Sequence, residues 1–384
     1  MTTLVGVRRA VTSPAINPSL FFDFRRGSLA ALTGAGLITF TRATTATYFN
    51  SSGLLATAAS GEARFEYDPV TLLSRGLWPL EPAATQLVTP TASIRDMTDA
   101  SWIKITTTAA LTATGIDGVV NSASTLTATG VNSTILQTLV AAASSRTYSA
   151  WVRRKTGSGT ILLKQGTATE DITSQINSTT YTLVDLNDNE LNVAYGFQIN
   201  TSGDEIEVDC NQFEAGAVAT SRILTAAGTR NADVAAITPL GSWFNAVEGT
   251  IVLDHIVSTG EDLASSMVFS FSDGTANELI ELFTTPSAFQ FSVIDGGISQ
   301  LTINTGVTTV GQATKIASTY KVNDFAISVN GAAVGTDVAG TLPTVDRLYV
   351  GCRNGASFFL YGGLRTFAYY PRRLSNAELQ RLSA

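Results

Sequence analysis

Short segments of alternating apolar and polar residues are the feature that most constrains what this chain can fold into. From about residue 96 onward these segments are rich in Val, Ile, Phe, Tyr and Thr, and Gly, Asn, Asp and Ser separate them. Phe325, Ile327 and Val329 alternate in this way and lead into Asn330-Gly331, which accepts the positive φ values of a tight hairpin turn. Segments with helical periodicity are nearly absent. The pattern predicts antiparallel β-sandwiches or barrels.

Prolines and turn signals divide the chain into three parts. Six of the ten prolines fall within residues 1–95, and this density does not fit a central sheet because proline lacks a backbone donor. We therefore expect an extended, irregular N-terminal arm over 1–95, whose apolar residues dock onto its own domains or onto partner subunits. We expect a first, jelly-roll-type sandwich over 96–235 and a second sandwich over 236–384. The predicted fold is all-β, with two tandem antiparallel β-sandwiches.

One short helix is expected, at the end of the chain. Ser375 and Glu378 have the spacing of a capping box, and Leu374 and Leu379 occupy the positions of a hydrophobic staple. A helix of this length is not stable alone. Its leucines are therefore expected to lie on the last sandwich.

Composition and charge exclude several classes of protein. Charged residues make up 14% of the chain and the net charge is −7, whereas nucleic-acid binding draws most of its affinity from Lys and Arg. No apolar run reaches the roughly 18 residues that a membrane span requires. The N-terminus carries its charge, Arg8-Arg9, after a very short apolar stretch, which is the wrong order for a secretory signal. We expect no nucleic acid, no membrane segment and synthesis in a cytoplasm.

The two cysteines are far apart in sequence and give no disulfide framework or metal-spaced set. Strand alternation places Cys210 on the apolar face with Ile206 and Val208. A free, buried thiol is the interpretation that this pattern favours.

The last 60 residues resemble the concanavalin-A-like (laminin-G-like) fold. The ending typical of that fold is an aromatic-rich strand followed by R-x-L-S-x-x-E and a short helix, and here it runs over 369–382 as YYPRRLSNAELQRL. The Val329-Asn330-Gly331 hairpin also belongs to that pattern. The resemblance implies a lectin-like sandwich at the C-terminus.

Four further segments resemble tail-fibre, head-fibre and related virion proteins of tailed phages. They are FTRATTATY at 40–48, RFEYDP at 64–69, QFEAGA at 212–217 and TRNADV at 229–234. In that family the last two segments close a jelly roll similar to carbohydrate-binding modules. The usual family variant has R-A-A-D, so Asn231 replaces an alanine here.

The resemblance implies a non-enzymatic structural component of a virion: a tail fibre, head fibre or decoration subunit. Its partners would be copies of itself, in a closed homo-oligomer similar to the trimers of such fibres, and other capsid or tail proteins. The N-terminal arm would attach it by burying apolar and paired side chains. The candidate attachment residues are Phe21, Phe22, Phe24, Phe40, Arg42, Tyr48 and Trp78.

Two alternatives to a purely structural role remain open. In the first, the chain is an adhesin that binds a host cell-surface glycan, because aromatic side chains can stack on sugar rings or form subunit interfaces. The candidate aromatics are Trp151, Trp243, Tyr361 and Tyr369. In the second, the chain is a glycan depolymerase that uses Glu207 and Asp209, since glycoside hydrolysis needs two facing carboxylates. Glu214, the third acid of that segment, falls on the opposite face unless a bulge intervenes.

No cofactor is indicated by the sequence, and its single histidine and one acidic loop both favour structural roles. His255, the only histidine, alternates with Ile251 and Leu253 and is expected in the core; no G-x-S-x-G nucleophile elbow accompanies it. Residues 185–190, DLNDNE, carry oxygen ligands at alternate positions like a calcium loop but fail the EF-hand pattern. A polar turn is favoured there, and a structural calcium ion remains an alternative.

Overall fold

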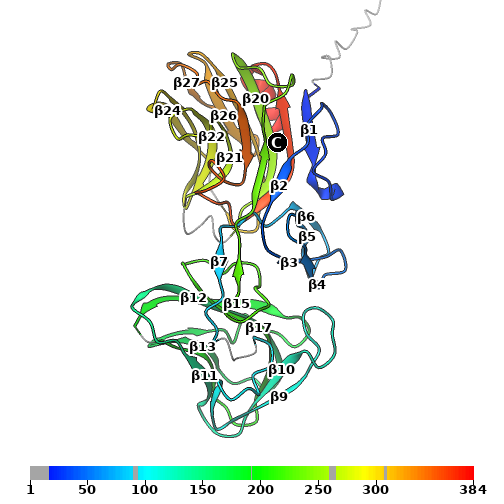
Figure 1. Cartoon of the computed structure of the whole chain (residues 1–384), viewed down its shortest axis with the longest axis vertical. Helices are drawn as coiled ribbons and strands as arrows, with labels where there is room; N and C mark the ends of the chain where they lie inside the picture. Colours follow the sequence, from blue (N-terminus) through cyan, green and yellow to red (C-terminus); the bar gives the residue numbers. More distant parts are fainter. Residues whose placement is uncertain (1–16, 90–93, 192, 259–264, 307–308) are drawn as a thin grey trace, which may run out of the picture.

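The chain consists of two β-sandwich bodies, one stacked above the other, in a computed structural model that describes residues 17–89, 94–191, 193–258, 265–306 and 309–384 (Figure 1). Nearly every described element is a strand, and every strand pair that forms the sheets is antiparallel. The prediction of an all-β chain with antiparallel sandwiches and a short C-terminal helix is confirmed. Arg8-Arg9 lie outside the described residues.

The lower body is built from two five-stranded sheets, in the orders β15-β12-β17-β10-β9 and β14-β13-β16-β11-β8. Their facing sides enclose a core of large rings that includes Trp102, Tyr148, Tyr195 and Phe213. The strands are β8 (Ile103–Ile105), β9 (Thr107–Ala113), β10 (Ala123–Ala128), β11 (Ser133–Thr138), β12 (Ser144–Thr156), β13 (Ile161–Gln165), β14 (Ala168–Asp171), β15 (Thr182–Glu190), β16 (Ala194–Ile199) and β17 (Glu205–Ala215).

The upper body packs an eight-stranded sheet, β27-β26-β25-β20-β29-β6-β5 with β1 on β29, against a seven-stranded sheet, β2-β19-β28-β21-β22-β23-β24. Its C-terminal strands are β19 (Val234–Ile237), β20 (Glu248–Ile256), β21 (Ser266–Ser272), β22 (Leu279–Thr285), β23 (Ala288–Asp295), β24 (Ile298–Thr305), β25 (Ala313–Lys321), β26 (Phe325–Val329), β27 (Gly335–Asp337), β28 (Arg347–Val350) and β29 (Gly363–Tyr370). Its N-terminal strands are β1 (Leu20–Asp23), β2 (Thr39–Thr41), β5 (Phe65–Tyr67) and β6 (Ser74–Leu77).

The described part of the N-terminal region is not an extended arm, which corrects the expectation from its prolines. β1 pairs with β29 from Leu20↔Tyr369 onward, and β2 pairs with β19. Phe22 and Phe24 are fully buried in the core of the upper body. β1 and β2 are too short to be stable by themselves. Each one pairs with a strand that lies more than 180 positions away in the sequence. The region therefore belongs to the C-terminal sandwich.

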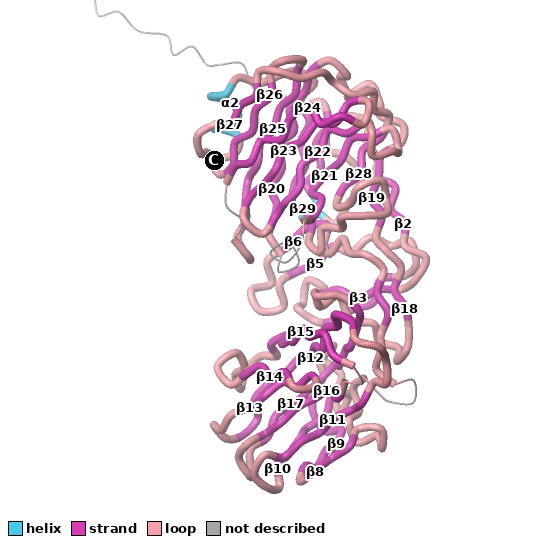
Figure 2. The backbone as a smooth tube through the Cα atoms, turned by 90° about the vertical axis from the view of Figure 1, so that its left-hand side faces the viewer, coloured by secondary structure: helices cyan, strands magenta, loops and turns pink. Residues whose placement is uncertain are grey.

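A hairpin from the same region reaches down to the lower body (Figure 2). It consists of β3 (Ala46–Phe49) and β4 (Leu55–Ala58), and Phe49 packs with Ile116 and Cys210 of the first sandwich. Just beyond, β7 (Ala84–Thr85) pairs with β18 (Thr229–Arg230). These contacts join the two bodies along two strands of connecting chain.

The turns and the cap follow their sequence signals. Asn330 and Gly331 have φ values of 49° and 70° and turn the chain from β26 to β27. Ser375 caps α2 (Asn376–Leu382) in a full capping box with Glu378. Leu374 and Leu379 are buried beside the C-terminal sandwich, as expected. The helical segments that the structure describes, η1 (Phe24–Arg26) and α2, are too short to cross a membrane.

Candidate functional site

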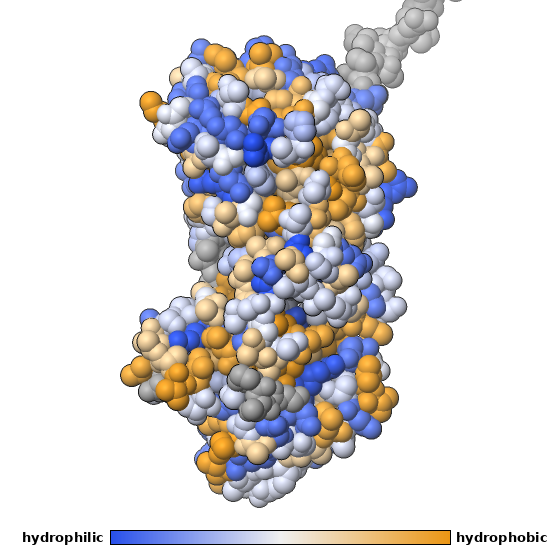
Figure 3. Space-filling model, in the orientation of Figure 1, coloured by the Kyte–Doolittle hydropathy of each residue, from blue (hydrophilic) through white to orange (hydrophobic). Residues whose placement is uncertain are grey.

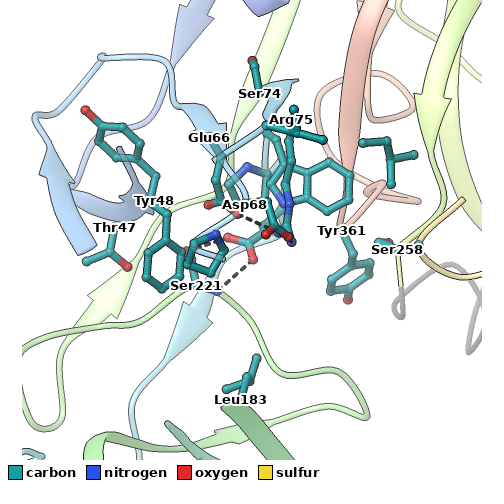
Figure 4. A pocket seen from close by; sticks show the side chains of 18 of the residues that line it. Thr47, Tyr48, Glu66, Asp68, Ser74, Arg75, Leu183, Ser221, Ser258 and Tyr361 are labelled. Carbon is teal, nitrogen blue, oxygen red and sulfur yellow. Dashed lines mark hydrogen bonds and ion pairs between the residues drawn. The ribbon is translucent and has the colours of Figure 1, made fainter. Parts of the chain in front are cut away.

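A groove of about 780 Å³ lies between the two bodies (Figure 4), at the waist visible in the space-filling view (Figure 3). Its volume is in the range of small-molecule sites in proteins. Three parts of the chain line it: the N-terminal hairpins, the lower body and the upper body. The residues used below are Tyr48, Glu66, Asp68, Arg75 and Trp78 of the first, Trp151, Leu183, Thr220 and Arg222 of the second, and Ser258, Tyr361 and Arg365 of the third.

Aromatic side chains reach the groove from all three parts. Trp151 on β12 is half-buried and meets the ring of Phe49 edge-on, with ring centroids 5.0 Å apart. Tyr361 is held by a hydrogen bond from its backbone N–H to the carbonyl of Leu80, 2.9 Å long. Trp78 lies under the guanidinium of Arg75, 5.5 Å from the ring centroid. The groove therefore combines apolar ring surface with charged groups.

Two carboxylates of the β5–β6 hairpin line the groove and share one arginine. Arg75 donates from Nη1 to Glu66 Oε1 at 3.0 Å and from Nη2 to Asp68 Oδ2 at 2.8 Å. Burial raises the pKa of Glu66 to about 7, against the opposing charges of Arg75 and Arg64. Burial alone would also raise the pKa of Asp68, but hydrogen bonds from the Thr71 and Val70 backbone and from Arg75 lower it. Asp68 therefore loses its proton at a lower pH than Glu66.

A buried cluster of ion pairs lies behind the groove. Arg42 and Arg64 both donate to Asp233, at 3.0 and 2.5 Å, and Arg64 also reaches Glu81 at 3.1 Å. Arg230 lies 3.3 Å from Glu81. The side chains of these five residues are at most 5% exposed. Burial would raise the pKa of Glu81, but Arg230, Arg64 and two hydrogen bonds from Ser221 lower it to about 2.

Three of the four sequence segments at 40–48, 64–69, 212–217 and 229–234 contribute side chains to this cluster. Arg42, Arg64 and the pair Arg230 and Asp233 come from the segments 40–48, 64–69 and 229–234, which are distant in sequence. Their charges neutralise one another inside the protein at the point where the two bodies meet. The role of these residues in the structure is to join the parts of the chain.

A β-bulge in β17 overturns the expected orientation of Cys210. Cys210 has φ 50°, and the register against β12 shifts between Ser149 and Trp151. Its side chain therefore packs with Phe49 and Ile116 on the outer face rather than with Ile206 and Val208 in the sandwich core. The thiol is free and buried, and burial raises its pKa.

The same bulge reverses the face of every later residue in β17, so Glu214 joins Glu207 and Asp209 on one side. Each of these acids is held by a protein partner. Asp209 accepts two hydrogen bonds from Arg95, both 2.7 Å long, and Glu207 accepts from Arg153 Nε at 2.7 Å. Glu214 is fully buried and accepts from the Thr220 backbone and hydroxyl. The three acids of the segment 207–214, EVDCNQFE, therefore make structural interactions with neighbouring side chains and backbone.

Four of the residues singled out from the sequence line the groove, namely Tyr48, Trp78, Trp151 and Tyr361. Trp243 and Tyr369 lie in the upper core instead, 5% and 0% exposed, where the Tyr369 hydroxyl pairs with that of Tyr320 at 2.7 Å. They are buried because β1 and β20 flank Tyr369 on both sides. These two rings are therefore inaccessible to a glycan or a partner.

The remaining candidate attachment residues are occupied within the chain. Phe22, Phe24 and Phe40 are at most 9% exposed in the upper core, and Arg42 belongs to the buried ion-pair cluster. Phe21 packs against the small cluster of apolar side chains around α2. The C-terminal sandwich covers the apolar surface of Phe22, Phe24 and Phe40, whereas Phe21 is half-buried.

His255 and the segment 185–190 have structural positions. His255 is fully buried on β20, with Nδ1 2.9 Å from the Gly363 carbonyl, as its alternation with Ile251 indicated. Residues 185–190 lie within β15, so the expected polar turn is wrong: the segment pairs with β12 from Ser144↔Glu190 to Ser149↔Asp185. Among the described residues, no group of three or more His, Cys, Asp or Glu side chains is arranged to hold a metal ion.

The groove could not have been found from sequence alone. Glu66, Asp68 and Arg75 have the simple alternation of a hairpin, and Arg365 lies in a strand that reads as core. For Glu66 and Asp68 the one signal in the sequence is the RFEYDP segment at 64–69, which indicates a family resemblance rather than a binding site. The neighbours that complete the groove come from about 75 to 300 residues further along.

The fold and the groove define a tandem antiparallel β-sandwich protein with an interdomain site. No family model matches the chain, and no curated protein matches it. Among solved structures it is similar to the CBM40 domain of the Ruminococcus gnavus IT-sialidase bound to α2,3-sialyllactose, with TM-score 0.32 and 20% identity, covering 36% of this chain and 84% of that one. It is also similar to the binding domain of botulinum neurotoxin serotype D, with TM-score 0.32 and 8% identity, covering 39% of this chain and 40% of that one. Likeness at this level bears on neither the ligand nor the activity of this chain.

Proposed function

We propose that the chain is a saccharide-binding protein and that the interdomain groove is its ligand site. The observation that carries this proposal is the convergence of the half-buried rings of Trp151 and Tyr361 with the Glu66–Arg75–Asp68 pairs around one groove of about 780 Å³. Rings offer flat apolar surface for the C–H faces of a sugar, and fixed carboxylates and guanidinium groups pair with its hydroxyls. Both kinds of group are present on facing walls.

The groove is suited to binding without turnover. Glycoside hydrolysis needs two carboxyl groups that flank the scissile bond with space between them. Here the guanidinium of Arg75 occupies the space between Glu66 and Asp68 and bonds to both. The proposal is therefore a lectin-like activity, with no release of reducing sugar when the protein is incubated with a polysaccharide that it binds.

The biological setting that we propose is an adhesin on the particle of a tailed phage, which combines the glycan-binding and virion interpretations. What supports it is the resemblance of the segments at 40–48, 64–69, 212–217 and 229–234 to phage virion proteins; three of these segments also supply the ion pairs behind the groove. Attachment to the particle would use other surface than Phe22, Phe24 and Phe40, which are buried. Labelling of purified particles with an antibody against this chain tests the setting separately from the binding.

Binding to immobilised envelope polysaccharides of candidate host bacteria tests the function. Trp151→Ala and Tyr361→Asn remove one ring from each body, and asparagine tolerates the positive φ of 56° at position 361. Each should weaken binding by about tenfold, the factor that corresponds to the loss of one well-packed ring contact. Tyr349→Ala, at a half-buried ring outside the groove, is the matched control.

Unchanged affinity in both groove variants, with normal unfolding curves, would place the ligand elsewhere. Absence of binding to every polysaccharide tested would reject saccharide binding itself.

A further inference from the structure

Arg365 occupies a β-bulge that points to a role in the groove. On β29, Leu364 pairs with His255 and Thr366 pairs with Asp254, so Arg365 is the extra residue between two consecutive partners. A bulge of this kind re-aims a side chain and is frequent beside binding sites. On its other side, β6 passes so close that a Cβ on Gly76 would lie 2.3 Å from the Leu364 carbonyl oxygen. The bulge brings Arg365 to the groove beside the strand that carries Arg75.

Arg365 differs from the other arginines of the groove in its partners. Of the described residues that line the groove, four are arginines, and three of them are held by oxygen acceptors. Arg25 donates twice to Asp23, Arg75 donates to Glu66 and Asp68, and Arg222 donates to the Thr220 carbonyl and the Ser149 hydroxyl.

The nearest acid does not satisfy Arg365. Its Nε lies 3.7 Å from Asp254 Oδ2, too far for a hydrogen bond, and this nitrogen has no hydrogen-bond partner within the described chain. Its side chain is 26% exposed. Arg365 is therefore a partly exposed guanidinium that no described residue holds by a hydrogen bond.

Asp254 is a buried counter-charge that does not bond closely to Arg365. Burial raises the pKa of Asp254, and the positive charges of Arg365, Arg25 and Lys315 all act on this one carboxyl group. Asp254 is 9% exposed, and its Oδ1 has no hydrogen-bond partner among the described residues. Since Arg25 is already paired with Asp23, Arg365 is the arginine of the upper wall that remains available to a ligand.

We propose that the groove selects acidic saccharides and that Arg365 binds the carboxylate of the sugar. This proposal rests on the proposed saccharide binding and adds the class of ligand. A planar guanidinium with open donors matches a carboxylate by two parallel hydrogen bonds. Tyr361, on the same wall, would pack against the ring of the sugar that carries the carboxylate.

The test uses matched pairs of oligosaccharides measured by titration calorimetry. The probes are tetrasaccharides of galacturonic, mannuronic and glucuronic acid, each with its carboxyl-reduced, neutral counterpart. The acidic member of at least one pair should bind about ten- to a hundredfold more tightly than its neutral counterpart, which is the range for charge-assisted hydrogen bonds.

Substitutions at Arg365 then test whether this side chain causes the preference for acidic saccharides. Arg365→Gln should remove the acid preference while neutral binding persists, and Arg365→Lys should restore part of it. Arg26→Gln is the matched control, because it removes the same charge from an exposed position that does not line the groove. Arg365→Gln is expected to fold, since the change breaks no hydrogen bond of this guanidinium within the described chain.

Three outcomes would overturn the proposal. They are equal binding of acidic and neutral members, no binding of any acidic probe, and an acid preference that survives Arg365→Gln. Saccharide binding with no acid preference would reject both the acidic ligand class and the role of Arg365 but leave saccharide binding standing, whereas failure of every neutral and acidic saccharide would reject the binding function itself.

Discussion

Arg64 and Asp233, 169 residues apart in sequence, form a buried hydrogen bond of 2.5 Å at the junction of the two sandwich bodies. Arg64 follows β4 and leads into β5, whereas Asp233 lies between β18 and β19, where the chain leaves the first sandwich and enters the second. Asp233 also accepts from Arg42 and from the Glu81 backbone N–H. The Asp233 carboxylate therefore holds together three segments of the chain, those that contain Arg42, Arg64 and Glu81, next to the groove.

Asp233→Asn should destabilise the protein strongly. The change leaves the guanidinium groups of Arg42 and Arg64 buried without their shared counter-charge, and breaking a buried pair in this way costs about 3–5 kcal/mol. Chemical denaturation followed by tryptophan fluorescence measures the loss. Asp346→Asn is the control, because Asp346 pairs with Arg347 at the surface, where an ion pair contributes about 0–1 kcal/mol. Equal effects of the two changes would contradict the structural role given to Asp233.

Local rules were sufficient for the elements of this fold. Alternation at Phe325, Ile327 and Val329 predicted β26, and Asn330-Gly331 predicted the turn after it, because these signals act between neighbours in sequence. The capping box at Ser375 was likewise predictable from four residues. Each of these interactions is complete within a few positions.

Long-range pairings could not be predicted in the same way. β1 and β2 are only four and three residues long, and their places depend on edges formed by β29 and β19. The bulge at Cys210 shifts one register and so exchanges the faces of the later residues in β17. The groove likewise depends on long-range packing, because residues from distant parts of the chain line it, and its residues were therefore found only in part.

Gly363→Ala should test the close approach of β29 and β6. A Cβ at this position would lie 1.8 Å from the Leu77 carbonyl oxygen and 3.0 Å from the Trp78 Cα, so the backbone must move. Overpacking of this kind costs about 1–3 kcal/mol. Saccharide binding should fall as well, because the strand that shifts carries Trp78 into the groove.

Thermal unfolding and binding, measured on the same samples, check this prediction. Gly130→Ala is the comparison, since its Cβ would meet only the Thr106 side chain, at 3.1 Å or more. A loss of stability in Gly363→Ala no larger than in Gly130→Ala would show that β6 can move away freely.

Ser375→Ala should cost about 1 kcal/mol of unfolding free energy, the usual contribution of an N-cap. The Ser375 hydroxyl accepts from the Glu378 backbone N–H, and the Glu378 carboxylate accepts from the Ser375 backbone N–H. Urea denaturation measures the change, and Ser357→Ala, at an exposed turn, serves as the control. If Ser375→Ala lowers the unfolding free energy no more than Ser357→Ala does, then packing of Leu374 and Leu379 alone holds α2 on the sandwich.

Glu66 should make stability fall as pH rises toward neutrality. Burial raises its pKa from 4.5 to about 7, so between these values the folded protein holds a proton that the unfolded chain has lost. The favourable contribution is present in full below pH 4.5 and is lost as pH rises through about 7. The difference corresponds to about 3 kcal/mol at most. Glu66→Gln, which stays neutral, should therefore match the wild type near pH 4.5 and exceed its stability near pH 8.

Urea denaturation of both proteins at the two pH values measures this difference directly, with Glu62→Gln, at an exposed carboxylate of the neighbouring turn, as the control for the loss of charge. Glu81 cannot produce the same signature, because its pKa is lowered to about 2 and its contribution is lost only as pH falls toward that value. A stability difference between Glu66→Gln and wild type that is the same at both pH values would mean that Arg75 holds Glu66 ionised throughout, since a charge that never changes adds no pH dependence.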